Sequence, residues 1–128
     1  MLAVGAHIKD GHKKDTSNFQ PYVRISAPGI NIWTTDMVGY TSNGYYKGYV
    51  NPAQYPQEYA GHSGTSHSSP IVAAVAAMAL GTRQSLTPAE LQERLILSNQ
   101  PLSSPYEWAN SQEIGRVDAY SAVTWGAP

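Results

Sequence analysis

The chain has 128 residues, the usual size of one domain, and a formal net charge of −1. The sequence therefore lacks the excess of positive charge that is typical of proteins that bind nucleic acid or an anionic membrane. Hydrophobic residues make up 41% of the sequence and charged residues 13%, which is compatible with a packed core and argues against disorder. The absence of cysteine excludes disulfide frameworks, thiol catalysis and cysteine-based zinc sites.

The start of the chain has the pattern of a strand. Residues 2–8 form a short, nearly continuous apolar run that predicts a buried strand, and residues 9–18 are polar and predict a surface loop. The first six residues lack the charged and long apolar regions of a signal peptide. No stretch reaches the roughly 20 apolar residues that a membrane span requires. We therefore expect the chain to begin within a larger fold and to cross no membrane.

Two further strands are predicted around a turn. Residues 22–26 alternate apolar and polar side chains and lead into Ala27-Pro28-Gly29, a strong turn signal. Residues 30–35 alternate again. The pattern predicts two short strands joined by a Pro-Gly turn.

A long loop is predicted over about residues 36–60, which are rich in tyrosine and lack periodicity. Clustered tyrosines can form a binding surface, because each offers apolar area with a polar tip. The alternative is an insertion that folds back on the body of the protein and packs by its rings.

Three helices follow. Residues 70–80 are apolar on every side and rich in alanine, which predicts a buried helix with Gly81 as its C-cap. Residues 87–90 (Thr-Pro-Ala-Glu) form a capping box for a second helix. An apolar stripe of Leu91, Leu95 and either Ile96 or Leu97 predicts that one face of this helix points inward. A short closing helix is predicted to start near Asp118.

The segment that carries chemistry is 64–73, Gly-Thr-Ser-His-Ser-Ser-Pro-Ile-Val-Ala. Gly64 leads into Thr65, which can cap a helix, and Ser66 would then lie in the first turn. There the free backbone N–H groups and the positive end of the helix dipole can stabilise an oxyanion. Pro70 lacks the N–H that would otherwise bond the carbonyl of Ser66, which loosens that turn. The pattern predicts a nucleophile anchored on a rigid helix.

This segment resembles the serine signature of the subtilisin-like (subtilase, peptidase family S8) serine proteases, Gly-Thr-Ser-x-[Ser/Ala]-x-Pro-x-Val-[Ala/Gly]. Four other landmarks resemble the family in the correct order. They are the strand at 3–6, Asn18-Phe19 with 26–29, the helix start at 86–91, and Gly-Arg-Val-Asp-Ala at 115–119. The resemblance implies that residues 1–128 are the C-terminal part of a catalytic domain. The implied fold is α/β, a partial three-layer α/β/α arrangement with a mostly parallel sheet.

By the same resemblance Ser66 is the acylated nucleophile, with Gly64, Thr65 and Pro70 supporting it. The family's His general base, its Asp and its oxyanion Asn all lie upstream of the equivalent of Ala3, and this sequence contains none of them. We therefore expect a complementary N-terminal part of the domain, or an oligomer, to complete the site. The chain alone is predicted to be inactive, because a triad serine without its base keeps little reactivity.

The histidines depart from the family pattern. His67 follows the serine where the family often has Met, but neighbouring helix residues do not face each other, so it is not predicted to be the base. His62 and His67 are possible cleft residues. His7 and His12 have no partners at metal spacing, and no loop has a credible set of calcium ligands, so we predict no metal or cofactor. Ser63 sits in a false Gly-x-Ser-x-Gly match and is interpreted as a loop hydroxyl.

Three functions remain open. The first is a serine endopeptidase that acts on polypeptides, to which this chain contributes Ser66. The second is an inactive subtilase-like fragment that serves as a binding or assembly module. The third is an α/β domain whose serine segment is coincidental. Family resemblance alone implies a secreted or extracytoplasmic location.

Overall fold

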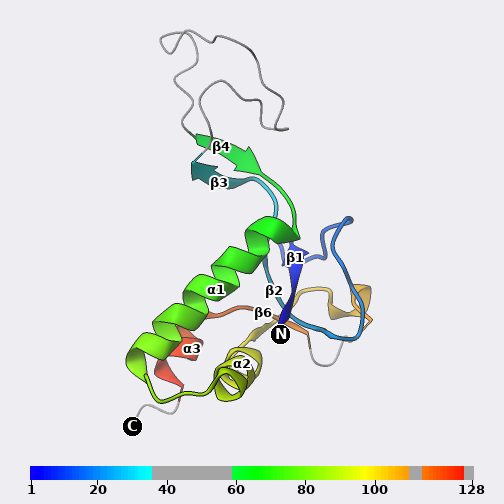
Figure 1. The fold of residues 1–128 in the computed structure, drawn as a ribbon. Helices are drawn as coiled ribbons and strands as arrows, with labels where there is room; N and C mark the ends of the chain where they lie inside the picture. Colours follow the sequence, from blue (N-terminus) through cyan, green and yellow to red (C-terminus); the bar gives the residue numbers. More distant parts are fainter. Residues whose placement is uncertain (36–58, 110–113, 126–128) are drawn as a thin grey trace, which may run out of the picture.

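The structure of the chain is a computed structural model, which describes residues 1–35, 59–109 and 114–125 (Figure 1). Six strands, three helices and one 3-10 turn occur in this part of the chain. In order they are β1 (Ala3–His7), β2 (Val23–Pro28), β3 (Ile32–Thr35), β4 (Tyr59–His62), α1 (Thr65–Thr82), α2 (Pro88–Leu97), β5 (Gln100–Pro101), η1 (Pro105–Glu107), β6 (Gly115–Arg116) and α3 (Ala119–Thr124).

The main sheet has the strand order β1-β2-β6-β5. Its β1–β2 and β2–β6 pairs are parallel, and only the short β5 runs antiparallel. This arrangement confirms the predicted α/β class with a mostly parallel sheet. Within the described residues β1 forms one edge of the sheet and β5 the other. Pro101 on β5 has no N–H to offer at its edge.

The main core lies between this sheet and the helices. Its members are buried apolar residues from β2 and from all three helices: Ile25, Ala27, Val72, Val75, Ala79, Leu95 and Ala122. Small alanines at 27 and 79 let α1 approach the sheet closely, and α3, which carries Ala122, packs against α1 (Figure 1). A second cluster joins Val23 to Leu102, Trp108 and Ile114. The strand predicted over 2–8 is confirmed as β1, and that over 22–26 as β2.

The strands on either side of the Pro-Gly turn do not belong to one sheet. β2 continues through Pro28, and β3 leaves to pair with β4 in a separate antiparallel ribbon, with Ile32 opposite His62 and Trp33 opposite Gly61. The loop predicted over 36–60 therefore ends earlier, because residues 59–60 belong to β4. The rest of that prediction, residues 36–58, lies outside the described residues.

Helix α1 is less buried than its composition predicts. Val72, Val75 and Ala79 face the sheet and are buried, whereas Met78 is 48% exposed and Leu80 is 36% exposed. A helix that is apolar on every side but packed on one side only leaves an apolar face uncovered by the described residues. The predicted C-cap is also wrong. Helix α1 continues through Gly81 to Thr82, and Arg83 is its C-cap.

Helix α2 begins as predicted. The Thr87 hydroxyl accepts a hydrogen bond from Glu90 N (3.3 Å), and the Glu90 carboxylate accepts one from Thr87 N (2.8 Å). These two bonds are the reciprocal pair of a capping box. Of the two residues proposed for the end of the apolar stripe, Ile96 is buried and Leu97 is 55% exposed. No helix among the described residues is long and apolar enough to cross a bilayer.

Helix α3 starts after Asp118, as predicted, because the Asp118 carboxylate caps Ser121 N at 3.0 Å. Its C-terminal end is held by Arg94 of α2, which is only 4% exposed. The Arg94 guanidinium donates to the carbonyl oxygens of Ala122 and Val123, the latter at 2.7 Å. A buried cation therefore satisfies carbonyls that a helix end leaves without partners.

Replacing Arg94 with Met is expected to lower the free energy of unfolding by about 2–4 kcal/mol, because two carbonyl groups at the end of α3 would lose their donor. Urea unfolding of the protein that contains this chain measures the change. The control is Arg83→Met, which alters an exposed arginine and should shift the value by no more than about 0.5 kcal/mol. Equal effects of the two substitutions would contradict a structural role for Arg94.

Candidate active site

Ser66 is the second residue of α1, and it is exposed. The chain reaches it from the β3–β4 ribbon, whose last residue, His62, precedes it by four positions. The 18-residue helix behind Ser66 packs on β1 and β2, so the serine lies at the N-terminal end of a rigid element (Figure 1). There the backbone N–H groups of the first turn have no partners within the helix.

The turn into α1 depends on Gly64. This residue is the N-cap, with φ 142° and ψ 168°, a backbone conformation that residues other than glycine rarely adopt. The prediction that Thr65 caps the helix is wrong, because Thr65 is already helical and no side chain caps α1. The Gly64 carbonyl instead accepts bonds from His67 N (3.1 Å) and Ser68 N (3.4 Å).

The end of β2 fixes this turn in place. Gly64 N donates to the carbonyl of Gly29 (2.8 Å), and the fully buried Ser68 hydroxyl lies 3.2 Å from the Ala27 oxygen and 3.1 Å from the Pro28 oxygen. A Cβ on Gly29 would lie 2.5 Å from Ala6 Cβ and 2.6 Å from Ser68 Oγ. The Ala-Pro-Gly and serine segments are therefore one packed unit.

Ser68 was missed by the sequence reasoning. Its signal was a small polar residue two positions after Ser66, at the start of an otherwise apolar helix. Pro70 lies inside α1, as predicted, and contributes no N–H to the helix. Ser63 is confirmed as a loop hydroxyl, since it accepts a bond from Asn31 N at 3.0 Å.

His62 and His67 lie together beside the serine. Their rings stack with centroids 5.3 Å apart and an angle of 7° between the planes. The His67 Nδ1 atom is buried and has no hydrogen-bond partner among the described residues. The first turn of α1 contains no acidic residue. The structure therefore brings two imidazoles, but no carboxylate from that turn, to the neighbourhood of Ser66.

The remaining described histidines have other partners. The buried His7 lies 2.9 Å from the Ser26 hydroxyl. His12 approaches both Ser104 Oγ (3.0 Å) and Glu107 Oε1 (3.1 Å) through the same atom, Nδ1. A catalytic relay requires the serine and the carboxylate on opposite ring nitrogens, so this cluster is not a triad. It connects the loop after β1 to η1.

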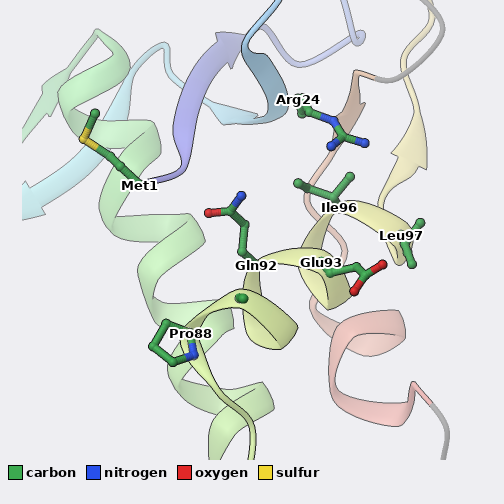
Figure 2. Close-up of a pocket in the computed structure, with 8 residues that line it drawn as sticks. Met1, Arg24, Pro88, Gln92, Glu93, Ile96 and Leu97 are labelled. Atoms are coloured by element: carbon green, nitrogen blue, oxygen red, sulfur yellow. The ribbon is translucent and has the colours of Figure 1, made fainter.

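Two cavities lie among the described residues without Ser66 in their lining. One of about 450 Å³ lies along α2, where Ile96 and Leu97 line it together with Met1 and Arg24 (Figure 2). Another of about 320 Å³ is lined mainly by apolar residues from the start of the chain, α1 and α2. Within residues 1–35, 59–109 and 114–125 no group of three or more acidic or histidine side chains could hold a metal ion. The site is thus a surface serine at a helix start.

Comparison with protein families gives a match to the model described as the subtilase family over residues 1–118. The chain is 31% identical over 110 residues to a thermostable alkaline protease of Halalkalibacterium halodurans, covering 86% of this chain and 26% of that protein. It is 33% identical over 125 residues to an extracellular protease of Xanthomonas campestris, and this match covers 97% of this chain and 19% of that protein. The chain thus spans about a fifth to a quarter of the length of these relatives.

Solved structures with the same fold include MycP1 from Mycobacterium smegmatis. It has a TM-score of 0.70 and 27% identity, with 99% of this chain and 30% of that chain covered. A protease structure from Pseudoalteromonas arctica has a TM-score of 0.75 over 96% of this chain and 35% of its own; at 23% identity it shows the fold alone.

Proposed function

Because this chain belongs to the subtilase family, we propose that it supplies the nucleophile Ser66 of a serine endopeptidase that cleaves polypeptides. The observation that carries the proposal is the placement of Ser66, exposed in the first turn of a helix whose N-terminus is anchored to the sheet through Gly29 and Ser68. A serine anchored at the start of a packed helix, next to backbone N–H donors, supports a role in covalent catalysis.

The reaction proceeds through an acyl-enzyme. The Ser66 oxygen attacks the carbonyl carbon of the scissile peptide bond, and its proton passes to a histidine base. The carbonyl oxygen becomes an oxyanion, which the Ser66 N–H stabilises together with an asparagine side chain. The base then gives its proton to the leaving amine as the C–N bond breaks. Water attacks the ester by the same route and frees Ser66.

The histidine, aspartate and asparagine come from a segment upstream of residue 1 or from a partner chain, in our proposal. Two features of the fold support a complementary segment. Strand β1 is an edge of the main sheet among the described strands, and α1 exposes apolar side chains such as Met78. We propose that residues 1–128 form the C-terminal part of one catalytic domain, and that this chain alone is inactive.

An inactive binding or assembly module is the second candidate. It is favoured by the lack of an acidic residue in the first turn of α1 and by the hydrogen bonds of His7 and His12 to residues other than Ser66.

Two curated relatives carry the name extracellular protease or extracellular basic protease. For this chain we propose secretion or an extracytoplasmic location on the same basis.

The test is fluorophosphonate labelling of the native protein followed by intact-mass and peptide mass spectrometry. An adduct on Ser66, abolished in Ser66→Ala and absent from the isolated chain, is the expected result, and the other masses in the sample identify the source of the histidine and aspartate. Ser63→Ala is the matched control and should still be labelled. Native protein that stays unlabelled at Ser66 would favour the binding module.

A further inference from the structure

The stacked pair His62 and His67 has no role in the chemistry described so far. His67 follows Ser66 on α1, so its Cα lies about 3.8 Å from that of Ser66, although the two side chains diverge around the helix by about 100°. The stack brings the His62 ring to the same place from β4. A substrate residue next to the scissile bond must lie near the start of α1 when its carbonyl carbon meets Ser66.

The surroundings of His67 indicate which of its ring nitrogens carries the proton. Its Nδ1 is buried without a partner among the described residues, and a buried N–H without an acceptor is costly. The neutral tautomer with its proton on Nε2 avoids that cost and leaves Nε2–H as the donor of this ring. His67 therefore presents a donor and lacks a described acceptor.

The charge around the pair is one-sided. The first turn of α1 has no acidic residue, and the N-terminal end of the helix is itself the positive end of its dipole. The neutral His67 ring adds its Nε2–H donor at this end of the helix. A carboxylate is a negatively charged acceptor, so it matches both the donor and the positive end of the dipole.

We infer that His62 and His67 form a subsite for an acidic side chain, so that the peptidase prefers substrates with Asp or Glu directly next to the scissile bond. This inference rests on the proposed function, because it requires Ser66 to be acylated by a peptide. The contact consists of charge-assisted hydrogen bonds from the imidazoles to the carboxylate, which strengthen as the substrate docks.

The experiment measures kcat/KM of the native protein for matched peptides that carry Asp or Asn at each position flanking the scissile bond. The expected result is a preference for Asp on the order of tenfold at one of these positions, which decreases as the salt concentration rises. This measurement needs no variant. Equal rates for the Asp and Asn peptides at both positions would overturn the inference.

Substitutions test whether the preference for Asp over Asn peptides comes from the His62–His67 pair. His67→Phe retains an aromatic ring but has no donor, and it should bring the Asp/Asn ratio close to one. His12→Phe, the matched control far from Ser66, should leave the ratio as it is. If His67→Phe keeps the ratio, His67 does not form the subsite. Fluorophosphonate labelling of the same samples separates the two proposals, because labelled protein without an acid preference contradicts only this one.

Discussion

Replacing Gly29 with Ala is expected to destabilise the protein by about 2–4 kcal/mol and to slow labelling of Ser66 by about a hundredfold. A methyl group on this residue would overlap Ala6 and the Ser68 hydroxyl, each of which must then move. Ser68 holds the first turn of α1 to the end of β2, so its displacement also displaces the nucleophile. Urea unfolding and the rate of fluorophosphonate labelling measure the two effects.

Gly81→Ala is the control for this substitution. Nothing lies within 4 Å of a Cβ at Gly81, which occupies the last turn of α1. Alanine has the higher helix propensity, so this variant should be unchanged or more stable by about 0.5 kcal/mol and should be labelled at the normal rate. If Gly29→Ala behaved like Gly81→Ala, the close packing of the serine segment on the Ala-Pro-Gly segment would be refuted.

Lowering the pH from 6.5 to 4 is expected to remove about 2–3 kcal/mol of stability through His7. Burial, with a smaller contribution from the charge of Arg116, lowers the pKa of His7 from 6.5 to about 4. The unfolded chain therefore binds a proton at a higher pH than the folded chain does. The stability from neutral His7 is complete above pH 6.5 and is lost as the pH falls through this window. Urea unfolding across it measures the loss.

His7→Asn is the variant that isolates this effect. Its stability at pH 7 should be lower, and its curve should be nearly flat between pH 6.5 and about 5. Below about pH 5 the carboxylates add a loss of their own, because hydrogen bonds from Thr87, Lys13 and Ser121 lower the pKa of Glu90, Glu107 and Asp118 below their ordinary values of 4.5, 4.5 and 3.8, and the unfolded chain therefore takes up these protons first. A variant with the same slope as the unaltered protein would show that His7 does not titrate in this window.

Local signals in the sequence predicted the elements that local chemistry determines. The capping box at Thr87 was predicted because each side chain and its backbone partner are three residues apart, and the start of the closing helix was predicted near Asp118, whose carboxylate caps it. Strand β6 was missed, since two residues carry no periodicity and their pairing with β2 links segments about 90 residues apart. The burial of α1 was overestimated because composition describes all faces of a helix, whereas packing depends on what lies against each face.

The nucleophile was predicted from a contiguous motif, and its surroundings were not. Ser68 acts through carbonyls some 40 residues upstream, and its polarity alone does not reveal those partners. Thr65 was assigned as the cap because threonine favours that position, but the conformation of Gly64 moves the start of the helix by one residue. The stack of His62 on His67 also depends on the path of the chain between β4 and α1, which spacing does not specify.

The two edges of the main sheet are limited in different ways in what they can bind. The outer edge of β1 is partly covered by the loop that follows it, because Ala6 N donates to Ser17 Oγ (2.8 Å) and Lys14 N donates to the Ala6 carbonyl (2.9 Å). The opposite edge is the two-residue β5, in which Pro101 lacks a donor. Among the described strands of the main sheet, neither edge therefore offers a long open ladder along which further copies of this chain could add.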